Sequence, residues 1–503
     1  MGTRGARRCR APAADGSRGG QDAQKGWGVR PDSQCEWEWV KTLEVCFIFF
    51  QIEKGAGIVY KKEKTSFCLS IIPRLAFLSS YMRMTMKTIG LVSFLLILSP
   101  IAGASTWSGQ SANWDSNEDP GWNGTGIPNG QGAEAYFSTK GNSTLVEDIT
   151  LGLVVYSGNS DNDRQIKLST AVLTLDRDGD GPEPVVFRNE ATHRNGRLSI
   201  SSGSIVLQDD LLLDNVGKST GTYSINISGS ISGTGNVIIR NIEKGYSTGS
   251  IRLVGSNSFY GEAWVESGTF MFNNSAFGYK TNTIHLGKTG GGDAAIISLG
   301  TRSITPNPIE VAADAGGTLL LGANITNELV TTYSGNITLG GDLVLMSEKL
   351  ETGDVLFSGT ISGDGGLRKI GQGPLTLSKP NDFTGGVVIE EGTVNATSAD
   401  ALGTGDLTIL AGGRVLLGAE ACISPAANLI CESNDVAQAA VSLPLEGVWQ
   451  VQTLTVNNQL QVKGVYGAIG SGAQYESSLF DGVGQLQVVG WGSHWDHLCD
   501  LLD

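Results

Sequence analysis

The sequence predicts an all-β fold of stacked coils, a β-solenoid, and three observations lead to this prediction. One segment recurs with the same turn residues 124 positions later. Short apolar strands alternate with glycine, asparagine and serine turns, and no stretch has a helical hydrophobic period. Glycine accounts for 70 of the 503 residues and punctuates apolar runs instead of forming a linker. Recurring turn glycines with alternating apolar residues are typical of a stacked β architecture.

The repeat consists of two blocks that return at slightly different spacings. The segment NSFYG at 257–261 returns as NDFTG at 381–385, a shift of 124 residues. Upstream, GSISGTG at 229–235 matches GTISGDG at 359–365 at a shift of 130 residues. The first copy therefore carries six extra residues between its blocks. A unit that accepts insertions at its turns is natural where each coil contacts only its neighbours.

From residue 145 onward, alternation of apolar and small polar residues predicts strands with one inward face. Clear examples are 172–175, 204–207 and 407–410. Turns at intervals of about 8–12 residues suit either a solenoid or a multi-sheet β-sandwich. The internal repeat favours the solenoid, whose coils stack at the inter-strand spacing of about 4.8 Å.

The charge of the chain is unevenly distributed. The formal net charge is −15, yet residues 1–85 carry 14 Lys and Arg against 8 Asp and Glu, a net charge of +6. The remainder therefore carries −21. Nucleic acids and anionic lipids require a basic face, so the acidic body argues against both as partners.

Residues 86–104 have the features of a secretory signal peptide. A basic start precedes a short apolar run, and an A-x-A exit predicts cleavage between Ala104 and Ser105. Such signals act at an N-terminus, so residues 1–85 are predicted to be a disordered leader or the product of an upstream start. The alternative is a genuine extension with an internal membrane anchor at 89–101. After signal cleavage, no integral membrane domain is expected.

The cysteines are also distributed differently between residues 1–85 and the body of the chain. Four of the seven cysteines lie in residues 1–85, whereas Cys422 and Cys431 lie in one irregular stretch of the body. In an oxidising compartment, two cysteines nine positions apart predict a loop disulfide. The alternative is two free buried thiols.

The most regular part of the chain lies between residues 357 and 417. Its segments are ISGDGGLRK at 361–369, GQGPLTL at 371–377, NDFTGG at 381–386, VIEEGTV at 388–394 and ALGTG at 401–405. This unit resembles the autotransporter-associated β-strand repeat of exported bacterial surface proteins. The likeness is degenerate at 225–299, where AFG replaces the ALG step.

The resemblance implies a parallel β-helix at the cell surface or outside the cell, with no family-wide catalytic residues to transfer. We expect this β-helix to span 145–440. A tryptophan-rich start at 105–144 is common in such proteins and would form an N-terminal cap. Residues 441–490 resemble their usual closing module, and 491–503 are expected to be an unstructured tail.

One motif has the spacing of a calcium loop. DRDGDG at 176–181 places Asp176, Asp178 and Asp180 at alternate positions, with glycine at the sixth place. The twelfth place, which needs a bidentate carboxylate, is Phe187. Asp-Gly runs between strands are also ordinary turns, which is the alternative interpretation. No other metal or cofactor is expected.

Trp107, Trp114 and Trp122 lie close together beside polar turns. If exposed, they would stack on sugar rings of a glycan. If buried, they would close the open end of a solenoid, which must otherwise expose its core.

These features predict an exported structural or adhesive protein and not an enzyme, with a surface glycan or other cell-surface material as its partner. The sequence has no Gly-x-Ser-x-Gly elbow and no metal-like histidine spacing. The alternative is a polysaccharide-binding or polysaccharide-degrading β-helix, because fold does not fix function. An enzyme should show a groove with converging carboxylates or basic residues, whereas a scaffold should show a uniform ladder.

Overall fold

The structure is a computed structural model in which the chain divides into two compact units, Met1–Leu96 and Ile97–Asp503. It describes residues 46–51, 59–64, 104–107, 112–114, 122–124, 126–159, 163–177, 183–218, 223–242, 249–273, 276–299, 304–323, 330–348, 354–432 and 439–490. In the first unit, β1 (Cys46–Gln51) pairs antiparallel with β2 (Val59–Lys64). The described residues form strands and turns and no helix, and so none that could span a membrane.

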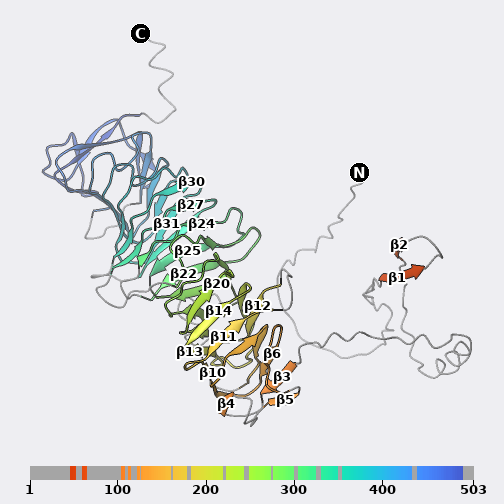
Figure 1. The fold of residues 1–503 in the computed structure, drawn as a ribbon. Coiled ribbons are helices and arrows are strands. Elements are labelled where there is room, and N and C mark those ends of the chain that lie inside the picture. The colour runs from red at the N-terminus through yellow and green to blue at the C-terminus, as the bar shows by residue number, and fades with distance from the viewer. Residues whose placement is uncertain are drawn as a thin grey trace, which may run out of the picture. The chain divides into compact units, whose positions relative to one another are not determined.

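In the second unit the chain winds through coils, and successive coils pair as parallel strands on three faces (Figure 1). Face one comprises β6 (Glu134–Phe137), β9 (Leu153–Tyr156), β12 (Val185–Asn189), β15 (Leu211–Asn215), β18 (Val237–Asn241), the first half of β20 (Ala263–Phe272), β21 (Ile284–Leu286), β24 (Ile309–Val311), β27 (Ile337–Leu339) and β30 (Ile361–Gly363).

Face two is the longest of the three. It comprises β7 (Gly141–Leu145), β10 (Arg164–Lys167), β13 (Leu198–Ser201), β16 (Tyr223–Ile227), β19 (Ser250–Leu253), the second half of β20, β22 (Ala294–Ser298), β25 (Leu319–Ala323), β28 (Leu343–Ser347), β31 (Leu367–Ile370), β33 (Val387–Ile389), β35 (Leu407–Ile409), β37 (Asn428–Cys431) and β40 (Thr453–Val456).

Face three consists of two sheets. They comprise β8 (Ile149–Leu151), β11 (Val172–Leu175), β14 (Ser204–Leu207) and β17 (Ser230–Gly233), then β23 (Ile304–Thr305), β26 (Thr331–Tyr333), β29 (Val355–Phe357), β32 (Leu375–Leu377), β34 (Gly392–Ala396), β36 (Gly413–Leu417), β38 (Val441–Leu443) and β44 (Phe480–Gly482). Turn segments at 257–261 and 276–279 lie between them. The parallel pairing confirms the predicted β-helix and excludes the sandwich.

Parallel register explains the inner core of the stack. On face one, Phe187 pairs with Val154 before it and Leu213 after it, and Ile239 and Val265 continue the same inward row. All five side chains are buried. Because alternate residues of a strand point to opposite faces, an inward row fixes an outward row beside it.

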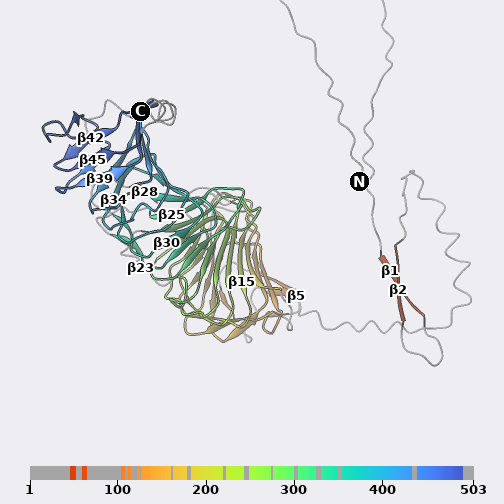
Figure 2. The same ribbon diagram turned by 90° about the horizontal axis from the view of Figure 1, so that it is seen from above.

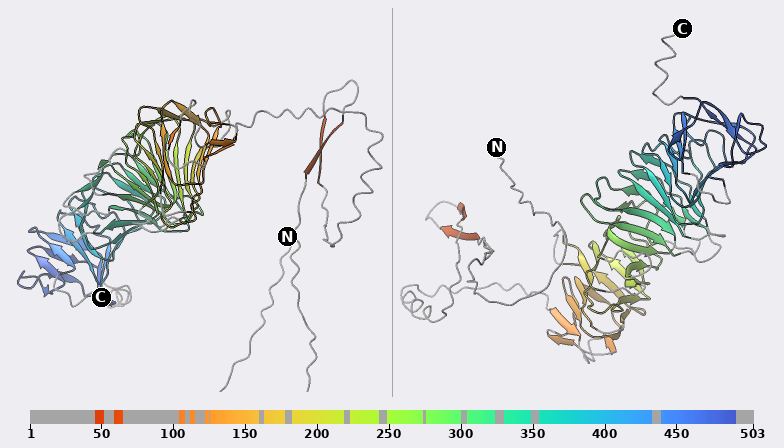
Figure 3. Two further views of the ribbon diagram at one scale, coloured as in Figure 1. Left: turned by 90° about the horizontal axis from the view of Figure 1, so that it is seen from below. Right: turned by 180° about the vertical axis from the view of Figure 1, so that it is seen from behind.

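Additional strands lie at the two ends of the stack. In Figure 3 the start of the stack is orange and its end is blue. At the start, β3 (Ala104–Trp107) pairs with β5 (Trp122–Gly124) and β6, and β4 (Ala112–Trp114) pairs with β7. At the end, β39 (Val448–Val451), β42 (Gly464–Gly467), β43 (Tyr475–Glu476) and β45 (Gln485–Val488) form a separate sheet (Figure 2), and β41 (Gln459–Leu460) pairs with β40. The coils begin ahead of the expected boundary at residue 145, because β6 and β7 already pair in register with β9 and β10.

The two copies of the repeat lie on different faces. In the first copy, β17, β18 and β19 lie on faces three, one and two, respectively. In the second copy, the matching strands β30, β31 and β32 lie on faces one, two and three. The second copy is therefore rotated by one face. Eight residues connect β18 to β19, against four between β31 and β32, so some of the extra residues of the first copy lie between these two strands.

Both copies use the same asparagine to join three coils where no strand is formed. Asn257 Oδ1 accepts a hydrogen bond from the Ile231 N–H, and its Nδ2 donates to the Ala276 carbonyl, both at 2.9 Å. In the second copy, Asn381 bonds in the same way to the Ile361 N–H and the Ala401 carbonyl, both at 2.7 Å. Both asparagines are buried. Buried backbone groups require a partner, which here is a side-chain amide.

One core position carries a lysine. Lys369 of β31 is 1% exposed, and it pairs in register with Leu345 and Ile389. Its Nζ donates to the carbonyl oxygens of Ile370 at 2.9 Å and Glu391 at 3.1 Å, and also to that of Gly371. Burial disfavours the ammonium form and lowers the pKa of Lys369 to about 8.

Replacing either bridging asparagine by alanine should lower the free energy of unfolding by about 2 kcal/mol or more, since a buried N–H and a buried carbonyl lose their partner. The adjacent exposed residues supply matched controls, Ser258→Ala beside Asn257 and Asp382→Ala beside Asn381. Denaturant unfolding of the four variants checks this. Equal losses in the asparagine and control variants would contradict the bridging role.

The stability of the chain should depend on pH through Lys369. Its pKa is about 8 when folded and its ordinary value is 10.5, so between these values the unfolded chain binds more protons. The free energy of unfolding should therefore rise with pH, by at most about 3 kcal/mol relative to the variant Lys369→Ile. Isoleucine is chosen because Ile239 holds the matching position in the first copy.

Unfolding curves of the native chain and Lys369→Ile at pH 7, 8, 9 and 10 measure this difference. Replacement of the half-exposed Lys288 by alanine provides the control. If the free energy of unfolding of the native chain minus that of Lys369→Ile stays constant or falls over this range, the pKa of Lys369 is not depressed.

Candidate functional site

The three predicted tryptophans lie inside the first coils. Trp107 and Trp114 are fully buried, and Trp122 is 5% exposed. Their rings pack against one another and against Phe137 with centroids 4.8 to 6.5 Å apart, and the buried Arg164 guanidinium lies 4.5 Å from the Phe137 centroid. Buried rings cannot stack on a ligand. The structure therefore corrects the expectation of a glycan-stacking surface and agrees with a cap over the core.

The two body cysteines are free thiols in the structure, which corrects the predicted disulfide. Cys431 is the last residue of β37 and points inward, and Cys422 is buried in the preceding turn. Burial in apolar surroundings raises the pKa of Cys422, and it raises that of Cys431 to about 12. A thiol with a raised pKa is a poor nucleophile, so these cysteines act as small core residues.

The predicted calcium loop lies only partly within the described residues. Asp176 accepts a hydrogen bond from Gln131 Nε2 at 3.0 Å, whereas Asp178 and Asp180 lie outside the described residues. Among the described residues, no group of three or more His, Cys, Asp or Glu side chains is placed to hold a metal ion. The calcium site stays a prediction.

The predicted signal cleavage site lies at the start of β3. Ala104 is exposed, and Ser105 is buried and donates through Oγ to the Gly126 carbonyl at 2.5 Å. Residues 86–103 lie outside the described residues, so cleavage stays a prediction. A chain beginning at Ser105 would retain the pairing of β3 with β6 at Ser105.

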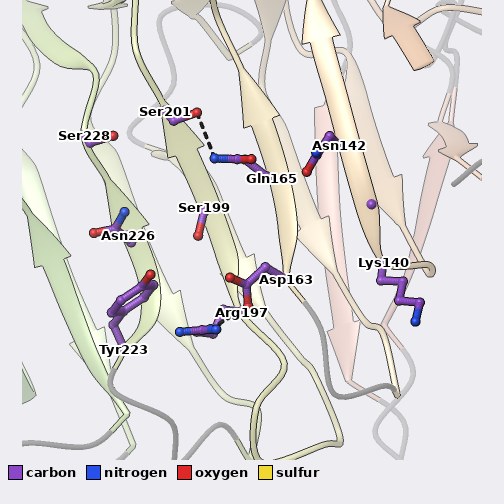
Figure 4. Close-up of a pocket in the computed structure, with 11 residues that line it drawn as sticks. Lys140, Asn142, Asp163, Gln165, Arg197, Ser199, Ser201, Tyr223, Asn226 and Ser228 are labelled. Atoms are coloured by element: carbon purple, nitrogen blue, oxygen red, sulfur yellow. Dashed lines mark hydrogen bonds and ion pairs between the residues drawn. The ribbon is translucent and has the colours of Figure 1, made fainter. Parts of the chain in front are cut away.

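A groove of about 560 Å³ lies on the outer side of face two, across β7, β10, β13 and β16 (Figure 4). Its lining residues are polar apart from Gly141, and Tyr223 adds an aromatic ring. The lining residues are Lys140, Gly141, Asn142, Asp163, Gln165, Arg197, Ser199, Ser201, Tyr223, Asn226 and Ser228. We take this polar groove as the candidate functional site.

The groove is built from outward positions of successive coils. One row runs from Asn142 to Gln165, Ser199, Asn226 and Arg252, each paired in register with the next. The inward neighbours of this row are buried residues, so strand alternation directs the row to the outer side of face two. An amide, hydroxyl or guanidinium group is therefore presented by each of five coils, at the inter-strand spacing of about 4.8 Å.

A β-bulge brings an aromatic ring into the groove. The pairing of β16 with β19 shifts register between Tyr223 and Ile225. A bulge redirects side chains, so Tyr223 and Asn226 both reach the outer side although three positions separate them. The Arg197 and Arg252 guanidinium carbons lie 4.8 and 5.9 Å from the Tyr223 ring centroid, within the range of cation–π attraction.

The electrostatics of the groove are set by one ion pair and by Lys140. Arg197 Nε bonds to Asp163 Oδ1 at 2.5 Å, and both side chains are about one-third exposed. Asp163 is the only carboxylate among the lining residues that the structure describes. Gln165 Nε2 donates to Ser201 Oγ at 3.2 Å, as Figure 4 shows.

Two polar atoms of the row lack a partner among the described residues. They are Asn226 Oδ1 and Arg252 Nε, and both atoms are buried. A buried polar atom without a partner costs about 1–3 kcal/mol, which a partner reached by rotation of the side chain recovers. The arrangement is thus suited to binding an extended polar molecule through hydrogen bonds.

The comparisons with known proteins give one partial similarity. The chain is 33% identical over 127 residues to a protein named "Adhesin BmaC autotransporter" from Brucella suis biovar 1 (strain 1330). The match covers 25% of this chain and 3% of that protein, so this chain spans a small fraction of its relative's length. No protein-family model matches the chain, and no solved structure matches it. The similarity supports a likeness to autotransporter proteins and assigns no family.

Proposed function

We propose that the chain is an exported adhesive protein of the cell surface, whose β-helix presents the polar groove to a glycan. The observation that carries the proposal is the row from Asn142 to Arg252, which offers hydrogen-bonding groups in successive coils. An extended chain of sugars lying across these coils would meet such groups repeatedly. The similarity to an adhesin autotransporter and the signal-like residues 86–104 support export and adhesion.

Binding is favoured over hydrolysis by the carboxylate content of the groove. Glycoside hydrolases use a pair of carboxyl groups flanking the scissile bond. The described lining has Asp163 alone, and Arg197 is bonded to it. We therefore propose adhesion without catalysis, and regard the stacked coils of the β-helix as the scaffold that holds the groove.

If the groove binds glycan, replacing Arg197 or Asn226 by alanine should weaken binding about 10- to 100-fold, the effect of losing one charged or buried hydrogen-bonding group. Arg368→Ala is the matched control, because Arg368 is an outward arginine of face two with its own partner, Glu390, outside the groove. A glycan array followed by titration of the best ligand measures the effect.

If Arg197→Ala and Arg368→Ala weaken glycan binding equally, the glycan does not bind in the groove. New reducing ends released from the bound glycan would instead show that the protein is an enzyme.

Export makes a separate prediction about the mature N-terminus. The exported chain should begin at Ser105, because the A-x-A exit ends at Ala104. N-terminal sequencing of the protein released by its natural host checks this. Recovery of a mature chain that retains residue 60 would contradict the predicted signal.

A further inference from the structure

The outward residues of the two repeat copies differ systematically. At four outward positions the first copy carries the aromatic side chains of Tyr260, Trp264, Tyr279 and His285. The matching residues of the second copy are Thr384, Val388, Thr404 and Thr408. The pairings match as well, since Trp264 pairs with His285 and Val388 pairs with Thr408.

The backbone around these positions is the same in both copies. The Tyr260 N–H bonds to the Gly233 carbonyl at 2.9 Å, and the Thr384 N–H bonds to the Gly363 carbonyl at 3.0 Å. Gly233 and Gly363 have φ of 109° and 112°, a region that favours glycine. The aromatic rings are therefore not needed to form this coil, because the second copy forms it with threonine and valine.

The four rings form two stacked pairs, which we call the aromatic row. Tyr260 and Tyr279 stack with centroids 4.3 Å apart and are 62% and 44% exposed. Trp264 and His285 stack with centroids 3.7 Å apart. Stacking explains how the rings are held in place, but it does not bury the tyrosine pair.

One flank of the tyrosine pair is bordered only by small residues. In the preceding coil, the backbone next to Tyr260 is the turn Gly233-Thr234-Gly235, whose largest side chain is a threonine. The ring face of Tyr260 that points away from Tyr279 therefore has no ring of that coil against it. A flat, rigid surface of this kind accepts another flat apolar face.

Polar groups lie at the edge of the aromatic row. His285 Nε2 lies 3.0 Å from Glu262 Oε2, and its Nδ1 lies 3.3 Å from Glu310 Oε2. Both glutamates are about half exposed and retain oxygen lone pairs for further donors. Lys280, beside Tyr279, is exposed and offsets part of the negative charge.

From this combination we infer that the aromatic row binds a neutral saccharide. The C–H face of one sugar ring packs on the free face of Tyr260, and hydroxyl groups of the saccharide donate to the Glu262 carboxylate in the same coil. Glu310 lies two coils further on, where it is available to another sugar unit of the chain. A polyanion is disfavoured because those carboxylates and the acidic body repel it. The site is separate from the polar groove: the row lies on face one and its preceding turn, the groove on face two.

The test is affinity electrophoresis of the full chain in gels containing dextran, mannan, xyloglucan or mixed-linkage β-glucan, with polygalacturonate as the anionic comparison. At least one neutral polysaccharide should retard the native chain. The double variant Tyr260→Thr/Tyr279→Thr should bind that polysaccharide at least about tenfold more weakly, because it removes both stacking rings. Its fold should persist, since threonine occupies both matching positions of the second copy.

The matched control is Thr384→Ala/Thr404→Ala, which should be retarded like the native chain. The inference is overturned if no neutral polysaccharide retards the native chain, or if the tyrosine double variant keeps full retardation. Adding Arg197→Ala and Asn226→Ala to the same gels separates the two sites. Loss in those variants alone would place the binding in the groove and reject the aromatic row, whereas loss in the tyrosine variant alone would do the reverse.

Discussion

The in-register parallel hydrogen bonding between successive coils is the constraint on which the structure depends. In its strands, each coil satisfies its backbone groups mainly through the coils before and after it. This register places the inward residue of one coil on the inward residue of the next, as Phe187 lies between Val154 and Leu213. It also aligns the outward residues into rows, so the core and the binding surfaces have the same physical origin.

The asparagine bridges show what happens where a coil leaves the strand conformation. Asn257 and Asn381 take over backbone hydrogen bonds to the coils on both sides, with the same atoms in each copy. Because these bonds are local to neighbouring coils, the unit works on any face of the stack. This explains how the second copy can be rotated by one face without a change in its internal geometry.

Local pattern was sufficient to predict the strands, the turn glycines and the stacked fold, because alternation and turn chemistry act over a few residues. The tryptophans were ambiguous because an aromatic ring suits both a core and a sugar surface, and only the end of the stack decides between them. The burial of Lys369 was not predicted, because a single lysine in a strand is ordinarily expected to be exposed to solvent. The groove could not be predicted from the sequence, because its row of residues spans positions 142 to 252 and Tyr223 joins it through a β-bulge.

The second copy of the repeat is rotated by one face relative to the first, and this rotation gives the two copies different outward surfaces. Trp264 lies on face one, whereas its counterpart Val388 lies on face two, so equivalent outward positions point in different directions. One ligand bound on one side of the stack cannot engage both copies at the same positions. Each outward row is thus independent of its counterpart, while inward residues such as Phe259 and Phe383 remain identical in type and fully buried. The shared inward residues preserve the coil, and the unshared outward residues are where recognition can differ.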